Sequence, residues 1–260
     1  MFKIFKYSFF DLIRSRWSIV YFLFFFVISV SLLYLSGDMS KVIISLLNII
    51  LILNPLIATI FGVMYYYNSR EFSELLLAQP IKRKSVFFGQ FLGLSVSLSL
   101  SFVLGLLVPF LLFRIFNTDQ VSNAFTLLFV GTFLTMIFSA IAFYIALKTE
   151  NKIKGFGKAI FVWLFFAVIY DGIFLLLLNS FNEYPLEKFA LVGSMLNPID
   201  LSRILILMKL DVSALMHFTG AVFSDFFGSS KGTIISFLIL SVWLIIPLFL
   251  INRRLKRKDF

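Results

Sequence analysis

The chain has 260 residues, of which 60% are hydrophobic and only 14% are charged, and its mean hydropathy is +1.01. Soluble domains carry charge on about a quarter of their residues, so this composition excludes a soluble globular protein and predicts an all-α integral membrane protein. The formal net charge of +10 does not indicate nucleic-acid binding, because the basic residues lie in clusters between apolar runs. No cysteine is present, which excludes a disulfide framework and a thiolate metal site.

Residues 1–16 are predicted to form an amphipathic helix that lies in the plane of the lipid headgroups. Apolar side chains recur there at helical spacing, and basic side chains flank them. A cytoplasmic start that is merely rich in positive charge is the alternative interpretation. The apolar set is Phe2, Phe5, Phe9, Leu12 and Ile13, and the basic set is Lys3, Lys6, Arg14 and Arg16.

Six apolar stretches in the segment 17–260 are long enough to cross a bilayer, which takes about 20 residues of helix. Barrel strands would alternate in polarity along short segments, and these stretches do not alternate. The predicted spans are Trp17–Ser36, Val42–Tyr67, Val86–Phe113, Phe125–Leu147, Ala159–Leu178 and Thr233–Ile251.

Most of the 23 Lys and Arg residues fall on one side of these spans, which predicts that both termini lie in the cytoplasm. That side receives the N-terminal segment, the second loop, the fourth loop and the C-terminal tail. An even number of spans agrees with termini on one face. The other side receives only Lys41, Arg114, Lys188, Arg203, Lys209 and Lys231.

The loop between the second and third spans, 68–85, is predicted to contain a short cytoplasmic helix. Glu71 and Glu74 precede the apolar run Leu75–Ala78, and Pro80 ends the helix before a basic cluster. The helix has a charged face and an apolar face. It is therefore suited either to fit a groove in a soluble partner or to rest on the membrane.

Small and polar residues inside the spans each allow two interpretations. Asn54-Pro55 indicates either a kink or a point at which the second span unwinds. Asp171 in the fifth span is, with Asn54, a candidate pathway residue, or it hydrogen-bonds across a dimer. Structural pairing near the outer interface is the alternative, because a charged side chain inside the membrane costs roughly 2.5–3.5 kcal/mol. Small residues recur at every fourth position of the third span. This pattern indicates either a seam at which helices move or a dimer forms, or a static contact between helices of one chain. The small residues are Gly89, Gly93, Ser97, Ser101 and Gly105.

The segment 179–232 is a large loop on the non-cytoplasmic side, and its apolar content predicts helices that pack on the membrane domain or form a docking surface. Asn197 is a predicted N-cap, followed by Pro198 at the first helical position and by Asp200 near the positive end of the helix dipole. Asp200 is predicted to pair with Arg203 one turn later.

Two groups of residues resemble those of a known family. The stretch Ser69–Pro80, followed by Arg83 and by Gly89–Gly93, resembles the first cytoplasmic loop and third span of type-2 ABC transporter permeases. The outer stretches Asn197–Arg203 and Thr219–Phe223 are similar to the subgroup that supplies the membrane subunit for nitrous oxide reductase maturation, the NosY type.

The resemblance implies a bacterial inner-membrane permease with an elbow helix at 1–16 and a coupling helix that binds a separate ATPase subunit of the NosF type. The loop 148–157 would make a lesser contact with the same subunit. A second copy of the chain and a periplasmic partner of the NosD type are also implied. That partner would lie on Asn197, Pro198, Asp200, Arg203 and Gly220, and the coupling residues would be Glu71, Phe72, Glu74, Leu75, Leu76, Gln79, Pro80 and Arg83.

The sequence itself carries no motif for chemistry. Gly155–Ala159 lacks the spacing and hydroxyl of a phosphate-binding loop, so ATP and Mg²⁺ are expected on the partner ATPase and no cofactor in this chain. H-E-x-x-H is absent, Tyr170–Gly172 has one acid without a second motif, and an enzyme is not predicted. Met216-His217 is too sparse for a copper site, so no metal site is predicted. The alternatives to a permease for nitrous oxide reductase maturation are an exporter of a drug, lipid or polysaccharide, a gliding-motility permease, and a motor-independent carrier.

Overall fold

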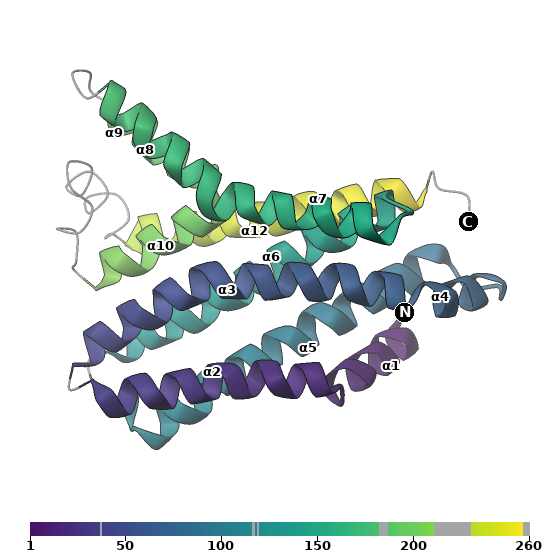
Figure 1. The fold of residues 1–260 in the computed structure, drawn as a ribbon, viewed down its shortest axis with the longest axis horizontal. Coiled ribbons are helices and arrows are strands. Elements are labelled where there is room, and N and C mark those ends of the chain that lie inside the picture. Colours follow the sequence, from purple (N-terminus) through teal and green to yellow (C-terminus); the bar gives the residue numbers. More distant parts are fainter. Residues whose placement is uncertain (37, 116–117, 119, 182–186, 211–229, 257–260) are drawn as a thin grey trace.

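The structure is a computed structural model of the whole chain, described here except for residues 37, 116–117, 119, 182–186, 211–229 and 257–260. The described part is a bundle of helices, and Figure 1 shows most of them lying along one long axis. The helices are α1 Phe2–Ile13, α2 Arg16–Leu35, α3 Met39–Asn68, α4 Arg70–Leu77, α5 Arg83–Leu112, α6 Val121–Lys148, α7 Lys152–Leu164, the π-helix η2 Phe165–Ile169, α8 Tyr170–Ser180, α9 Glu187–Met195, α10 Pro198–Lys209 and α12 Ser230–Leu255.

Six helices are long and apolar enough to cross a membrane, and each coincides with a predicted span. The fold class is therefore confirmed as all-α and multi-pass. Most helix ends extend past the predicted bounds because polar residues continue the helices, whereas α2 and α5 each end one residue before the predicted bound. The fifth span is composed of α7, η2 and α8, and the bent pair α9–α10 passes the same test with an angle of 114° between its helices.

Side-chain caps mark the first residues of three of the six spans, at the starts of α2, α3 and α7. Ser15 accepts a hydrogen bond from the Ser18 N–H at the start of α2, and Asp38 accepts one from the Ser40 N–H at the start of α3. Asn151 accepts two from the first turn of α7. Because the first four N–H groups of a helix have no partner within it, each cap fixes the residue at which the chain enters a span.

The core lies where α3, α5 and α6 pack together. Spans α5 and α6 are mostly buried, whereas no residue in the apolar window of the span Lys152–Ser180 is buried. Helices α1 and α2 cover α5, and α12 packs on α6. The bundle therefore has a covered side, formed by α1 and α2, and an uncovered side, formed by α7, η2 and α8.

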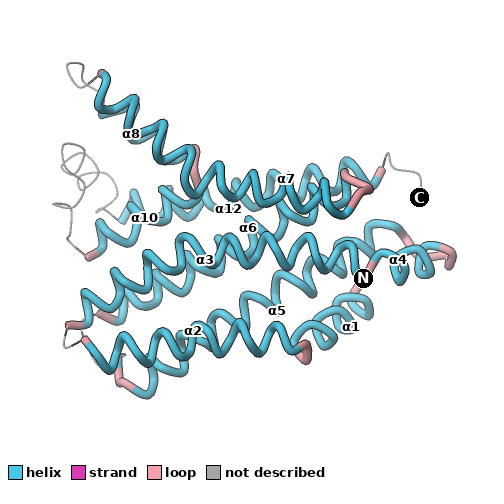
Figure 2. Tube along the Cα trace, in the orientation of Figure 1, coloured by secondary structure: helices cyan, strands magenta, loops and turns pink. Residues whose placement is uncertain are grey.

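The two ends of the bundle differ. The start of α1, helix α4, the turn between α6 and α7 and the last turn of α12 lie at one end, as Figures 1 and 2 show. Helices α9 and α10 lie toward the other end. The loops that the sequence assigns to the basic side are thus gathered at one end of the molecule, which we call the α4 end.

Helix α1 is held by protein as well as by any lipid contact. Its buried residues are Ser8 and Leu12, which lie against α5, while Phe2 of the predicted apolar set is exposed. A glycine seam on α5 makes this packing possible, as described below. The helical segment was predicted from its periodicity, but its contact with α5 was not.

Candidate functional site

Helix α4 is fixed to the bundle from within. It begins directly after α3, and Ser69 is both the C-cap of α3 and the N-cap of α4. Ser73 is buried, and its hydroxyl exchanges a hydrogen bond with the side chain of Gln90 on α5. This short connection leaves α4 little freedom to move without α3 and α5.

The outer face of α4 is exposed and amphipathic. Glu71 and Glu74 are exposed, and Leu75, which follows Glu74 and lies one turn after Glu71, has 68% of its surface exposed. Arg70 donates a hydrogen bond to Glu74 at 2.9 Å, which raises the pKa of the Arg70 guanidinium. An exposed leucine ringed by charge is typical of a protein-docking surface.

The remaining predicted coupling residues lie either on the partly buried side of α4 or beyond its C-terminal end. Phe72 and Leu76 are half-buried, whereas Gln79, Pro80 and Arg83 are exposed beyond the helix end. The ring of Phe72 stacks on Tyr7 of α1 with the ring centres 5.0 Å apart. Helix α4 therefore contacts α1 as well as α5, and the three form one assembly at the α4 end.

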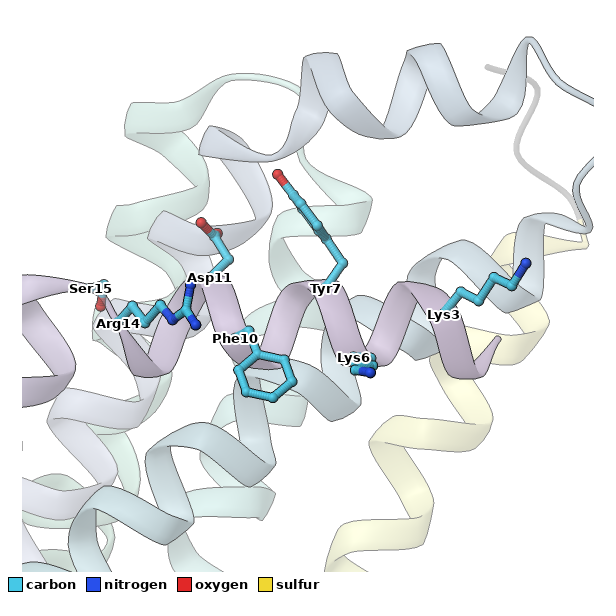
Figure 3. A pocket seen from close by; sticks show the side chains of 7 residues that line it. All are labelled: Lys3, Lys6, Tyr7, Phe10, Asp11, Arg14 and Ser15. Carbon is cyan, nitrogen blue, oxygen red and sulfur yellow. The ribbon is translucent and has the colours of Figure 1, made fainter.

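Beside this contact, α1 presents a basic face over an open hollow of about 840 Å³. Figure 3 shows that Tyr7 and Asp11 point to one side of α1 and Phe10 to the other. The Arg14 guanidinium lies 5.7 Å from the centre of the Phe10 ring, in cation–π range. The hollow is lined by Lys3, Lys6, Tyr7, Phe10, Asp11, Arg14 and Ser15.

The turn between α6 and α7 is joined to the same assembly. Tyr67, in the last turn of α3, donates its hydroxyl hydrogen bond to the Thr149 carbonyl at 2.6 Å. A Cβ at Gly155 would overlap the Tyr67 ring, so this glycine lets α7 approach α3 closely. Lys152 adds a hydrogen bond to Asn68, the last residue of α3. A movement of α4 and α3 would therefore also move the start of α7.

Asn54 lies in a buried polar cluster in the middle of the bundle. Its Oδ1 accepts hydrogen bonds from the Tyr21 hydroxyl on α2 and from Thr135 on α6, and its Nδ2 donates to the Gly131 carbonyl at 2.7 Å. Helix α3 continues through Pro55 without unwinding. The cluster joins three spans, and the amide makes its hydrogen bonds to protein instead of facing an open pathway.

We expect Asn54→Leu to lower the free energy of unfolding by about 1–2 kcal/mol, because the buried Tyr21 hydroxyl loses its acceptor. Thermal unfolding of the purified protein in detergent measures the change. Thr132→Val is the matched control, since among the described residues the Thr132 hydroxyl donates to the Leu128 carbonyl one turn earlier in the same helix and joins no other span. Equal melting temperatures for Asn54→Leu and wild type would contradict a structural role for the cluster.

The small-residue stripe of α5 is covered by helices of the same chain. A Cβ at Gly89 would come within 3.0 Å of Ile4, and one at Gly93 within 2.5 Å of the Ser8 Cβ, both on α1. At Gly105 it would meet Phe25 of α2 at 2.9 Å. Ser97 and Ser101 between them are buried. The stripe thus faces α1 and α2, and this structure does not offer it to a second copy.

At the other end of the bundle, Asn197 and Asp200 start α10 as the spacing predicted. The Asn197 Oδ1 accepts from the Ile199 N–H, Pro198 occupies the first turn, and the Asp200 Oδ1 lies 3.3 Å from the Arg203 Nη1. The same Nη1 donates to Asp171 at 2.9 Å. Arg203 therefore lies between two carboxylates, and Asp171 forms the ion pair that was one of its two predicted roles.

A π-helix in the fifth span is the feature that sequence reasoning missed. At η2 the span changes direction in Figure 1, and the Phe166 carbonyl accepts a hydrogen bond from the Asn197 Nδ2 at 2.8 Å. The Tyr170 hydroxyl donates to the Gly193 carbonyl at 2.6 Å, and Trp243 of α12 donates to the Met195 carbonyl. The bend between α9 and α10, which we call the outer corner, is thereby attached to spans five and six.

Helix α10, which follows the outer corner, is packed into the bundle. Leu201, Leu205 and Ile206 of α10 are almost fully buried, and α10 packs on α6, α12 and α3. The apolar content of this helix was a signal for such burial, but it predicted surface packing equally well. Gly220, the stretch Thr219–Phe223 and Met216-His217 lie outside the described residues.

The comparison with known proteins bears on this geometry. A family model described as "ABC-2 family transporter protein" matches residues 29–260. The chain belongs to this family. It is similar to a "Probable ABC transporter permease protein NosY" of Stutzerimonas stutzeri, with 28% identity over 215 residues that cover 75% of this chain and 76% of the relative. A protein of the same name from Pseudomonas aeruginosa is 25% identical over 230 residues, covering 78% and 80%.

As an ABC-2 permease, the chain is a membrane subunit of an ABC transporter and works with an ATP-binding partner. Residues 29–260 include α4, the α6–α7 turn and the outer corner, so the family match spans every feature described above except α1 and the first part of α2. The predicted family is confirmed, and the roles of individual residues remain to be proposed.

Proposed function

We propose that this permease receives ATP-driven movement from a separate ATPase subunit that binds the outer face of α4. The exposed Leu75 beside Glu74 and one turn after Glu71 carries the proposal, because an exposed apolar residue near charged residues suits a groove on a soluble partner. The turn between α6 and α7 lies at the same end and would add a lesser contact. The excess of Lys and Arg in the loops at this end supports a cytoplasmic location for it and for both termini.

The contacts behind α4 give the movement a route into the membrane. Ser73 connects α4 to α5 through Gln90, Phe72 connects it to α1 through Tyr7, and Tyr67 connects α3 to the start of α7. Packed helices joined in this way move as bodies instead of bending continuously. We infer that closure of the ATPase pair would tilt α3, α5 and α7 together.

Two copies of the chain would complete the transporter. The fifth span exposes an apolar side, including Leu164, Val168 and Ile173, that no described helix of this chain covers. In the membrane a second copy or lipid must cover it, and a pair of ATPase subunits calls for a pair of permeases. The seam of α5 is already occupied, so the uncovered side formed by α7, η2 and α8 is the proposed dimer face.

We propose that the transporter serves the maturation of the copper sites of nitrous oxide reductase. A periplasmic partner would bind the outer corner. The names of both relatives and the Asn197–Arg203 stretch support this assignment. An exporter of a drug, lipid or polysaccharide is the second candidate. A neighbouring gene for a periplasmic β-helix protein would favour maturation over export.

The docking proposal is tested with Leu75→Asp. We expect binding of the ATPase encoded beside this gene to weaken about tenfold or more, because a central apolar anchor is replaced by a third acid. Co-purification and stimulation of ATP hydrolysis in nanodiscs measure the effect. Ala78→Asp is the matched control, since it adds the same charge at the exposed C-cap of the same helix without removing an anchor. Unchanged co-purification of Leu75→Asp would refute the assignment of α4.

A further inference from the structure

A groove of about 510 Å³ opens between the last turns of α6 and the first turns of α7, at the α4 end of the bundle. It is separate from the hollow beside α1, because the two share no lining residue. None of the described residues that line it is acidic. The lining consists of Tyr144, Ile145, Lys148, Thr149, Gly157, Lys158, Phe161 and Val162.

The polarity of the groove changes with depth. On α6, Tyr144 and Ile145 lie one turn deeper than Lys148, and spacings of three and four residues place side chains on one face of a helix. On α7, Phe161 and Val162 lie one turn deeper than Lys158 in the same way. Both walls therefore carry a cation nearer the α4 end and large apolar side chains one turn farther from that end.

Lys158 is the more informative of the two lysines. It lies six residues inside α7, which is about 9 Å along the helix axis from Lys152. A cation at that depth either extends toward water or binds an anion that enters the interface. Together Lys148, Lys158 and the Thr149 hydroxyl supply donors on both walls of one groove, as a phosphate group requires.

We propose that this groove binds one anionic phospholipid. Its phosphate would lie between Lys148 and Lys158, and an acyl chain would follow Tyr144, Ile145, Phe161 and Val162 toward the membrane interior. The apolar depth favours a lipid over free phosphate, and the two cations favour an anionic over a zwitterionic headgroup. The site does not depend on the docking role of α4.

Gly157 supports the proposal from a different direction. It lies within a helix, where glycine is unfavourable relative to alanine, and a Cβ built on it would meet nothing within 4 Å. Unlike Gly155 two residues earlier, it is not required by close packing with α3. A side chain at position 157 would project into the groove, so the glycine keeps space open for a ligand.

The test uses the full-length protein in phosphatidylcholine nanodiscs, titrated with phosphatidylglycerol and followed by native mass spectrometry. Lys148→Gln/Lys158→Gln is expected to weaken retention of phosphatidylglycerol about tenfold. Gly157→Leu is expected to weaken it similarly while both lysines remain. Lys152→Gln/Lys154→Gln removes the same charge from the same helix start outside the groove, and it is expected to bind as wild type does.

Three results would overturn the proposal. Equal loss in the Lys152→Gln/Lys154→Gln control would show general surface charge only, and unchanged binding by Gly157→Leu would show that the groove is not the site. Displacement of the lipid by millimolar inorganic phosphate would show that the acyl chain is not recognised. Melting temperatures in phosphatidylcholine identify any variant that fails to fold, and Gly157→Leu then decides the outcome, since its side chain enters open space.

Discussion

Replacing Arg203 with methionine is expected to lower the free energy of unfolding by about 3 kcal/mol. The guanidinium lies between Asp171 and Asp200, and removing it leaves two carboxylates without a cation. Asp200 is the costly one, because only 7% of its side chain is exposed and its attraction to Arg203 is little screened by water. Asp171 and Arg203 are more exposed, at 28% and 29%, so the loss falls at the lower end of the range for buried pairs.

The same chain offers a matched control for this prediction. Arg70 and Glu74 form an ion pair of equal length, 2.9 Å, but half of each side chain is exposed. Exposed pairs contribute about 0–1 kcal/mol, so Arg70→Met is expected to change the melting temperature little. Adding Asp200→Asn to Arg203→Met should restore much of the stability, because a neutral amide needs no cation. If the double variant is no more stable than Arg203→Met, buried charge is not the cause.

Gly93→Val is expected to detach α1 from α5, with a loss of about 3 kcal/mol in the free energy of unfolding. A Cβ at this position would lie 2.5 Å from the Ser8 Cβ and 3.0 Å from the Phe9 backbone nitrogen. Neither atom can turn aside, since both are fixed to the α1 backbone, so the whole helix must move. Trypsin would then cut at Lys3 and Lys6 faster than in wild type, and thermal unfolding would begin at a lower temperature.

Gly172→Val serves as the comparison for Gly93→Val. A Cβ at Gly172 would meet nothing within 4 Å, so the substitution tests the effect of valine in a helix without a packing partner. We expect a change within about 0.5 kcal/mol and wild-type cleavage at the N-terminus. Rapid cleavage in both variants would mean that α1 is released for a reason unrelated to the seam.

Periodicity and charge were sufficient to predict the spans, α4 and the start of α10. Each of these depends on local features: a run of apolar residues, an acid in the first turn, or the Asn197-Pro198 pair. The side of a helix that packs within the chain is not local information. Phe2 and Leu12 both belong to the apolar stripe of α1, yet one is exposed and the other buried. Lipid and protein are equally apolar, so hydropathy does not distinguish them.

The polar contacts of the candidate site were less predictable for a related reason. Asp171 and Arg203 are 32 residues apart, and Asn54 and Gly131 are 77 apart. No spacing rule reaches over such separations. The stripe Gly89–Gly105 correctly predicted that α5 packs closely against another helix. It did not predict which helix, because small residues fit a partner chain and a neighbouring helix equally well. Only the folded arrangement distinguishes α1 and α2 from a second copy.

The π-helix η2 sets the rotational phase between the two halves of the fifth span. A π-turn contains one more residue than an α-turn, and one residue of α-helix corresponds to 100° of rotation. In a regular α-helix of the same length, Asp171 would point about 100° away from its present direction while the start of α7 stayed in place. The π-turn thus absorbs one residue and aligns the carboxylate with Arg203, and converting it to α-helix without shortening the chain would turn Asp171 away from the outer corner.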